Sequence, residues 1–309
     1  MTDSANPMDI LLAQAGLDQA SLARRTAPAL RQWLRTIIPP MEAEAVPVDN
    51  ADDIELDGPA GPLRLRVYQP FDAMQNGAGL VFFHGGGYTT GDLDTHDRLC
   101  RRLAAVSGVR IASVDYRLAP EHKFPAAVDD ALAALDAIVG GGLSEYGFSN
   151  DALAVGGDSA GGGLAAVLAQ ARRSQLRFQL LIYPLLQLVE VKKDRPRWQD
   201  GPLLSSEMLR QIQKQYLTAP QTEAGDLRVS PLLNDNLTGL PPAYIVAAEL
   251  DPLLDEGKAY ADRLAASGVA VERVLYTGVP HAFFNMSKIV KPCIPAIEAA
   301  GRALAKALG

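Results

Sequence analysis

The sequence predicts an α/β fold built on a mostly parallel sheet. Short continuous apolar runs, typical of strands buried on both faces of a sheet, alternate with stretches that have the length and apolar spacing of helices. An alternation of strand and crossover helix indicates a doubly wound sheet. The chain has 309 residues, 48% of them hydrophobic and 21% charged, which suits one large globular domain.

The expected elements follow one another along the chain. An amphipathic helical segment covers 9–34, and Pro39 and Pro40 are expected to close it. Alternating apolar and polar residues at 63–68 predict a half-exposed strand, and the more polar 53–57 before it favours an antiparallel start to the sheet. Buried strands are then expected at 80–83, 109–114, 153–155, 180–183, 243–247 and 271–276. Crossover helices are expected at 97–106, 126–139, 161–172, 252–266 and 295–308.

One stretch, 186–221, interrupts this alternation. It carries a charged run from Glu190 to Arg197, then Trp198, and then a helical pattern from Ser205 to Leu217. We expect it to form an insertion above the sheet.

Charge and cysteine content exclude several classes of function. The net charge of -7 and the pI near 5.2 give no broad attraction to nucleic acid. Cys100 and Cys293 lack metal-ligand spacing and are expected to be reduced thiols, not a disulfide or a metal site. The first residues lack a signal-peptide pattern, and no apolar run approaches the length of about 18 residues that suggests a membrane span, so we expect a cytoplasmic protein.

The strongest chemical signal is the sequence Gly-Asp-Ser-Ala-Gly at 157–161. It directly follows the predicted strand 153–155 and directly precedes a helix rich in small residues. That context is what a nucleophile elbow requires, because a sharp turn between strand and helix projects the serine hydroxyl from the edge of the sheet. Ser159 is therefore the predicted nucleophile.

A serine hydroxyl needs a positioned general base, and the base needs a partner that fixes its tautomer. His281 follows the predicted strand 271–276 and comes after Ser159, as the order of this triad requires. Asp251, which follows the strand 243–247 and precedes Pro252, is the expected acid. Glu249 and Asp255 are its competitors, and the position at the strand end favours Asp251. The other histidines, His84, His96 and His122, precede Ser159 and are expected to be structural or surface residues.

Three consecutive glycines follow His84, directly after the predicted strand 80–83. Such a loop brings backbone N–H groups to a developing oxyanion, together with the N–H of the residue after the nucleophile. The expected donors are Gly85, Gly86 and Ala160. A phosphate-binding loop is the rival interpretation, but no Lys-Ser/Thr pair follows the glycines and the GxGxxG spacing is missing.

With these motifs the chain resembles the hormone-sensitive-lipase-like, or family IV, bacterial esterases of the α/β-hydrolase fold. The motifs occur in the family's order from about residue 60 onward: His84-Gly85-Gly86-Gly87, the run 115–121, the run 157–161, Ser230-Pro231-Leu232, Asp251-Pro252-Leu253 and His281. The resemblance implies an eight-stranded, mostly parallel sheet flanked by helices. It also implies a helical cap, formed by N-terminal helices in 1–45 and by the insertion 186–221 within a catalytic domain of 46–309.

The resemblance further implies roles for individual residues. His84 would hold the glycine loop by hydrogen bonding, and Asp115 and Arg117 would be structural. The chain departs from the family at Ala282, where glycine is usual, and at Leu254, where a basic residue is frequent. The first departure could narrow the space beside His281.

The function expected from the sequence is that of a serine carboxylesterase, which hydrolyses small esters with short to medium acyl chains through an acyl-enzyme. It requires no cofactor and no metal. A homodimer is compatible with the resemblance, because related esterases often pair along sheet edges. An amidase or peptidase with the same triad is the nearest alternative, and a non-catalytic ligand-binding relative is the alternative from another class.

Overall fold

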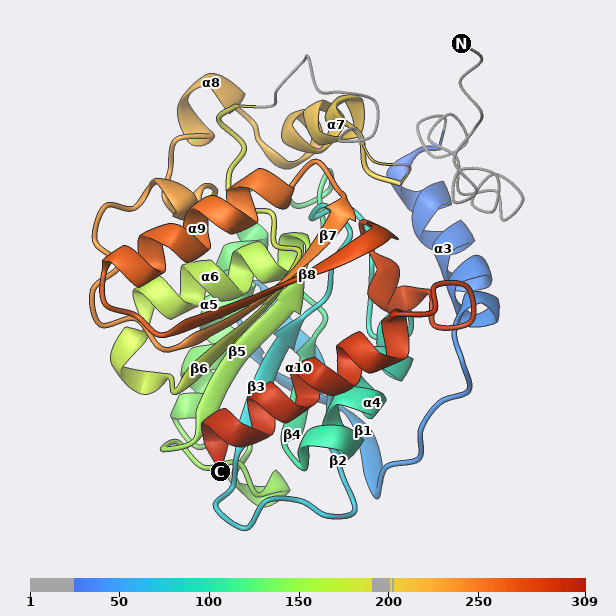
Figure 1. The fold of residues 1–309 in the computed structure, drawn as a ribbon, viewed down its shortest axis with the longest axis vertical. Helices are drawn as coiled ribbons and strands as arrows, with labels where there is room; N and C mark the ends of the chain where they lie inside the picture. The colour runs from blue at the N-terminus through green and yellow to red at the C-terminus, as the bar shows by residue number, and fades with distance from the viewer. Residues whose placement is uncertain (1–24, 191–200, 202) are drawn as a thin grey trace.

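A sheet of eight strands forms the centre of the molecule, in the order β1-β2-β4-β3-β5-β6-β7-β8 (Figure 1). The computed structural model describes residues 25–190, 201 and 203–309. The strands are β1 (Asn50–Gly58), β2 (Gly61–Gln69), β3 (Gly79–Phe83), β4 (Arg110–Val114), β5 (Leu153–Asp158), β6 (Phe178–Ile182), β7 (Ala243–Leu250) and β8 (Val271–Pro280). β2 pairs antiparallel with both β1 and β4, and the remaining pairs are parallel, so the predicted antiparallel start and parallel continuation are confirmed.

Helices cover both faces of the sheet (Figure 1). On one face lie α5 (Ala126–Val139), α6 (Ala160–Ala171) and α9 (Leu254–Ala266), and on the other lie α4 (Asp97–Ser107) and α10 (Cys293–Leu308). Each face has its own hydrophobic core, one built on Val81 and Leu181 and the other on Leu80 and Leu180. Neighbouring residues of one strand thus point to opposite cores, which explains the continuous apolar runs in the sequence.

Two further helices lie at the end of the sheet where the site forms, namely α3 (Ala27–Met41) and α7 (Ser206–Tyr216). A short helix, α8 (Pro220–Glu223), follows α7. Much of the expected helical segment 9–34, namely 9–24, lies outside the described residues, as do 191–200 and 202 of the insertion.

The expected end of the N-terminal segment at Pro39 and Pro40 is wrong, because α3 includes both prolines and ends at Met41. A proline removes the hydrogen bond to the carbonyl four residues earlier, so prolines in the last turn disturb only this end of the helix, whose own last carbonyls need donors from outside. Here Arg98 Nη1 donates to Pro39 O at 2.7 Å and to Glu42 O at 2.9 Å.

Arg117, implied to be structural, forms an ion pair inside the fold. Its Nη2 lies 2.7 Å from Oδ1 of Asp130, a residue that is buried on α5. The neighbouring Asp115 donates its backbone N–H to Arg64 O at 2.9 Å. These contacts tie the loop after β4 to α5 and β2.

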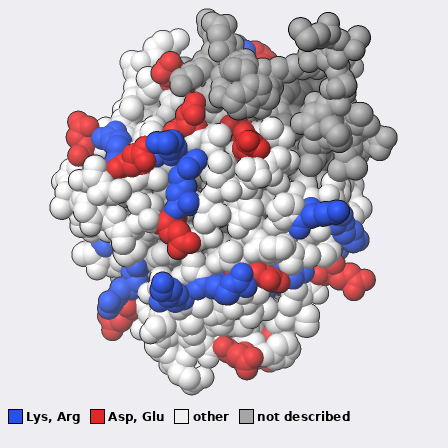
Figure 2. All heavy atoms as spheres, viewed as in Figure 1, with Lys and Arg blue, Asp and Glu red and all other residues white. Residues whose placement is uncertain are grey.

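The face shown in Figure 2 carries blue and red side chains side by side, separated by wide uncharged areas. On this face, the interspersed signs provide no single-sign field to attract a polyanion. In the part of the chain that the structure describes, no helix has the length and apolarity to span a bilayer.

The parallel strands place the predicted chemical groups at one edge of the sheet. The glycine loop follows β3, Ser159 follows β5, Asp251 follows β7 and His281 follows β8. Parallel strands end at the same edge, so residues far apart in sequence meet there.

Candidate active site

Ser159 occupies the turn between β5 and α6 with φ 53° and ψ -118°, a conformation that is rare outside glycine. The surrounding backbone holds it there. Its N–H donates to Ile182 O at 2.9 Å, and its carbonyl accepts from Gly163 N at 3.0 Å and from Leu185 N at 2.9 Å. A Cβ on Gly161 would lie 1.9 Å from Phe83 O, so this helix approaches β3 only because position 161 is glycine.

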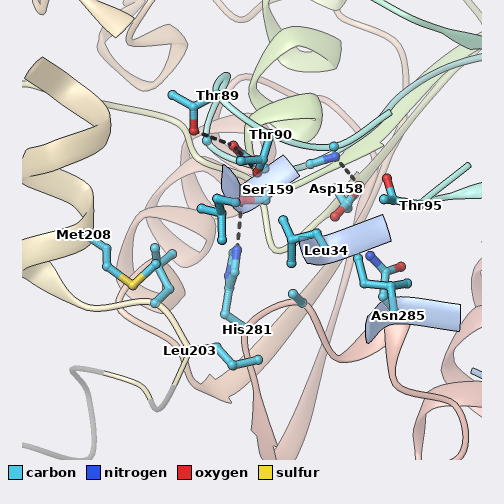
Figure 3. A pocket seen from close by; sticks show the side chains of 18 of the residues that line it. Leu34, Thr89, Thr90, Thr95, Asp158, Ser159, Leu203, Met208, His281 and Asn285 are labelled. Atoms are coloured by element: carbon cyan, nitrogen blue, oxygen red, sulfur yellow. Dashed lines mark hydrogen bonds between the residues drawn. The ribbon is translucent and has the colours of Figure 1, made fainter. Parts of the chain in front are cut away.

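The structure brings the three predicted triad residues into one hydrogen-bonded series (Figure 3). His281 Nε2 lies 2.8 Å from Ser159 Oγ, and His281 Nδ1 lies 2.7 Å from Asp251 Oδ2. The exposed fractions of Ser159, His281 and Asp251 are 7%, 6% and 1%. A hydroxyl, an imidazole and a carboxylate in this order can transfer the hydroxyl proton to the imidazole during attack on a carbonyl carbon.

Neighbouring groups fix the acid and the base of this series. Asp251 Oδ1 accepts the N–H of Leu253 at 2.9 Å, which leaves Oδ2 to His281. The ring of Tyr183 lies 4.8 Å from the imidazole of His281 at an interplanar angle of 59°. Ala282, which replaces the family's usual glycine, has φ 59° and lines the cavity beside His281.

A cavity of about 200 Å³ opens onto Ser159 and His281. Much of its apolar lining comes from α3 and from the insertion with α7: Leu30, Leu34, Ile38, Leu203, Met208 and Ile212. Figure 3 shows Leu34, Leu203 and Met208 around the two catalytic side chains. An apolar pocket with a few polar groups at one end suits a small molecule that carries a hydrocarbon chain.

Among residues 25–190, 201 and 203–309, no three His, Cys, Asp or Glu side chains lie close enough to hold a metal ion. Cys100 and Cys293 are both buried free thiols.

Comparison with known proteins identifies the family. The family model described as the alpha/beta hydrolase fold matches residues 80–285. The chain belongs to the α/β-hydrolase family. The match includes the glycine loop, the elbow, Asp251 and His281.

Several relatives of this α/β hydrolase are named as ester hydrolases. It is 40% identical over 273 residues to the carboxylic ester hydrolase LipN of Mycobacterium tuberculosis, which covers 84% of this chain and 71% of LipN. It is 40% identical over 251 residues to an ethyl acetate hydrolase of Pseudomonas putida, covering 79% and 78% of the two chains. A solved esterase structure from Pyrobaculum calidifontis superimposes with a TM-score of 0.86 at 36% identity, over 98% of both chains. The resemblance to hormone-sensitive-lipase-like esterases is thereby confirmed.

The first glycine of the loop has a hydrogen-bond partner inside this α/β hydrolase. Gly85 N–H, predicted as an oxyanion donor, donates to Asp158 Oδ1 at 2.7 Å. Its only hydrogen is engaged, so the contact does not favour Gly85 as a donor. All three glycines line the cavity, Gly86 and Gly87 with φ 119° and 61°, and Ala160 begins α6.

His84 and His96 are both buried beside this loop. The position of these histidines in the sequence indicates only structural or surface residues. His84 Nδ1 lies 2.9 Å from Gly85 O, as the resemblance implies. Burial and the nearby His96 lower the pKa of His84 to about 4, so it is neutral at neutral pH and its Nδ1–H can donate to that carbonyl. The remaining His122 is exposed.

Sequence reasoning missed the contact between His96 and the residue before the nucleophile. His96 Nε2 lies 3.1 Å from Asp158 Oδ1. An acid at 158, directly before the nucleophile in a turn packed between strand and helix, is the signal in the sequence that a cationic partner must exist, since an unpaired buried carboxylate is unfavourable. The identity of that partner required the fold.

Proposed function

We propose that this α/β hydrolase is a serine carboxylesterase in which Ser159 is the nucleophile, His281 the general base and Asp251 the residue that orients the base. The observation that carries the proposal is the series from Ser159 Oγ to His281 Nε2 at 2.8 Å and from His281 Nδ1 to Asp251 Oδ2 at 2.7 Å, at the mouth of an apolar cavity. The named esterases among its relatives support the same activity.

The reaction proceeds in two steps. In the first, His281 Nε2 takes the Ser159 proton as Oγ attacks the ester carbonyl carbon, and the imidazolium then returns this proton to the departing alcohol. In the second, water loses a proton to His281, attacks the acyl-enzyme, and releases the carboxylic acid as Ser159 regains its proton. Asp251 stabilises the imidazolium in both steps and is not itself protonated.

The tetrahedral intermediate requires hydrogen-bond donors for its oxyanion. We assign this role to the N–H groups of Gly86, Gly87 and Ala160, with Gly87 in place of Gly85. Gly86 and Gly87 border the cavity beside Ser159, and Ala160 begins α6, whose first N–H groups have no partner within the helix. By analogy with measured oxyanion donors, each contributes about 2.7–4 kcal/mol to stabilisation of the transition state.

The cavity supports substrates with short to medium acyl chains. Its apolar walls favour hydrocarbon at about 0.8 kcal/mol for each buried methylene, and its volume of about 200 Å³ limits the chain length. One relative is named an ethyl acetate hydrolase, which supports activity on small acyl groups. Three expectations stay predictions of the sequence: the cytoplasmic location, the homodimer, and the cap as a separate unit of 1–45 and 186–221.

A set of p-nitrophenyl esters of graded chain length, assayed beside the matched p-nitroanilides, tests the proposal. We expect ester hydrolysis, little anilide hydrolysis, and loss of all but a trace of turnover in Ser159→Ala. Ser174→Ala, at an exposed serine in the 3-10 turn that follows α6, is the matched control and should behave as wild type. Faster cleavage of anilides than of esters would favour an amidase. Binding of esters without turnover in the wild type would favour a ligand-binding protein.

A further inference from the structure

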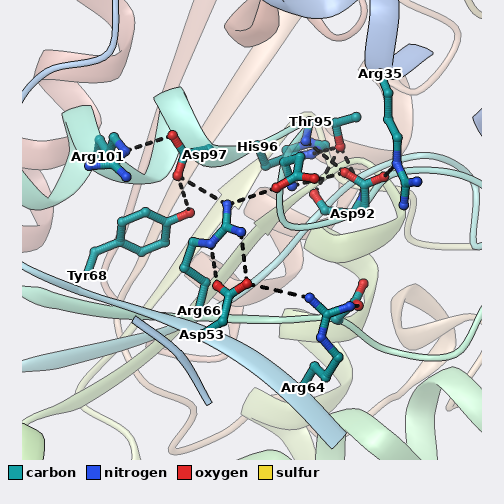
Figure 4. A network of polar contacts seen from close by, with 12 residues as sticks. Arg35, Asp53, Arg64, Arg66, Tyr68, Asp92, Thr95, His96, Asp97 and Arg101 are labelled. Atoms are coloured by element: carbon teal, nitrogen blue, oxygen red, sulfur yellow. Dashed lines mark hydrogen bonds and ion pairs between the residues drawn. The ribbon is translucent and has the colours of Figure 1, made fainter. Parts of the chain in front are cut away.

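A continuous series of polar contacts joins the cap helix α3 to the residue before the nucleophile. Figure 4 shows its outer part, where Arg35 reaches down from α3 to Asp92. Arg35 Nε lies 2.5 Å from Asp92 Oδ2, and Asp92 Oδ1 accepts the N–H of Thr95 at 2.8 Å. The side chain of Thr95 returns this contact, because its Oγ1 accepts the N–H of Asp92 at 2.9 Å. The loop 92–95 is thereby anchored to α3.

The inner part of the series leads from Thr95 to the glycine loop. Thr95 Oγ1 lies 3.0 Å from His96 Nδ1, and His96 Nε2 lies 3.1 Å from Asp158 Oδ1. The same Asp158 oxygen accepts the N–H of Gly85 at 2.7 Å. His96 and Asp158 are 3% and 2% exposed, so water does not compete for these contacts.

The charges of this buried pair support each other. Burial disfavours the imidazolium, but the nearby carboxylates, Asp158 first among them, together outweigh burial and raise the pKa of His96. Burial likewise disfavours the Asp158 carboxylate, but His96 and the Gly85 N–H outweigh it and lower the pKa of Asp158. Both groups therefore favour their charged forms in the fold, which strengthens the hold on Gly85.

The two sides of Gly85 are held by different groups. Asp158 accepts its N–H, and His84 Nδ1 contacts its carbonyl oxygen at 2.9 Å. The carbonyl of Gly85 and the N–H of Gly86 belong to one planar trans peptide and point in opposite directions. Fixing Gly85 on both sides therefore fixes the direction of the Gly86 N–H, the assigned oxyanion donor.

We propose that His96 is a positioning residue for the oxyanion loop, and that Arg35 extends this control to the cap helix α3. The proposal rests on the proposed esterase function. His96 keeps Asp158 on the Gly85 N–H, so the Gly86 N–H meets the oxyanion in the transition state. Arg31 lies one helical turn earlier on α3. It donates to Thr89 O at 2.7 Å and so contacts the segment directly after the glycine loop. Docking of α3 and preorganisation of the oxyanion donors are thus coupled.

The test compares His96→Leu, His96→Gln and Arg35→Leu in the full chain. Three quantities are measured: kcat and KM for one p-nitrophenyl ester, and the inhibition constant of an alkyl trifluoromethyl ketone, whose serine adduct carries an oxyanion. We expect His96→Leu to lower kcat and weaken the inhibitor by a similar factor, about thirty-fold, with KM within about two-fold of wild type. His96→Gln, which offers an amide N–H toward Asp158, should recover most of this loss. Arg35→Leu should lose about five-fold in both quantities.

Two matched substitutions serve as controls. Arg210→Leu removes an arginine of α7 whose partner is Glu207 on the same helix, and His122→Leu removes an exposed histidine. Both should leave kcat and the inhibition constant unchanged.

Two results would overturn the proposal. One is an equal loss of kcat in His96→Leu and His96→Gln, because the donor toward Asp158 would then not matter. The other is a rise in KM alone in His96→Leu, because a purely structural disturbance of the pocket would produce that change. His96→Leu leaves a buried carboxylate without its partner and can fail to fold. In that event the kinetics of Arg35→Leu and His96→Gln test the proposal. Arg35 is 58% exposed, so its replacement disturbs the fold less. If the wild type hydrolyses no ester but still binds the ketone, this contradicts the esterase function. It does not contradict the positioning role of His96.

Discussion

Asp251 Oδ2 lies 2.7 Å from Nδ1 of His281, on the side of the imidazole opposite Ser159. This contact assigns the proton of neutral His281 to Nδ1 and leaves the lone pair of Nε2 facing the serine hydroxyl. The carboxylate therefore selects the tautomer that can act as a base.

Asp251→Asn keeps the shape of this contact and removes its charge. We expect kcat on esters to fall by about 10⁴-fold with little change in KM, because the amide favours the wrong tautomer and no longer stabilises the imidazolium. Asp255→Asn, four residues further on the exposed side of α9, is the control and should retain wild-type kcat. Steady-state kinetics on both variants would refute the assignment of the acid if Asp255→Asn were the impaired one.

Leu34 brings an apolar side chain from α3 to the cavity beside Ser159. We expect Leu34→Ala to reduce kcat/KM for a hexanoate ester by about ten-fold while changing the acetate ester less than about two-fold, since only the longer chain reaches this wall. Phe71→Ala, at a surface residue that is 66% exposed, provides the comparison. A chain-length profile identical to that of wild type would mean that α3 does not line the acyl site.

Glu42, at the C-terminal end of α3, is a carboxyl group with an exposed fraction of 3%. Burial raises its pKa from 4.5 to about 8. Between these two pH values the folded protein keeps a proton that the unfolded chain has lost. Stability therefore falls as pH rises through this window, by up to about 1.4 kcal/mol for each pH unit.

We expect Glu42→Gln to remove this slope and to be more stable than wild type at pH 8, with a smaller difference at pH 5. Urea unfolding at pH 5, 6.5 and 8 measures the effect. Glu44→Gln, two residues away and exposed, should follow the wild-type curve. Parallel curves for wild type and Glu42→Gln would show that Glu42 does not titrate in this window.

The sequence predicts the sheet well because apolar runs report burial directly. The runs 80–83 and 243–247 begin within one residue of β3 and β7. Three of the predicted runs stop short of the strand end, since β5 continues to Asp158, β7 to Leu250 and β8 to Pro280. These strands extend into polar or glycine residues because their last residues position the site, and function at that edge outweighs apolar patterning.

The triad could be predicted because each member follows a strand in a fixed order. The polar contacts that hold the loops around the triad could not be predicted from the sequence. Arg35 and Asp92 are 57 residues apart, and nothing local to either residue indicates the other. The same holds for His96, which directly precedes α4, and its partner Asp158 at the end of β5. The contact of Gly85 N–H with Asp158 has the same origin, and nothing local to the glycine loop indicates it.

The central claim is that Ser159 forms the covalent intermediate, and reaction with a p-nitrophenyl alkylphosphonate tests it most directly. The phosphonate phosphorus would bond to the serine Oγ with release of p-nitrophenolate, giving an adduct that does not hydrolyse. We predict one equivalent of p-nitrophenolate for each chain, complete loss of esterase activity, and mass spectrometry that finds the phosphonyl group on the peptide containing Ser159. Complete inactivation with the label on a different residue, or full labelling with activity retained, would contradict the claim.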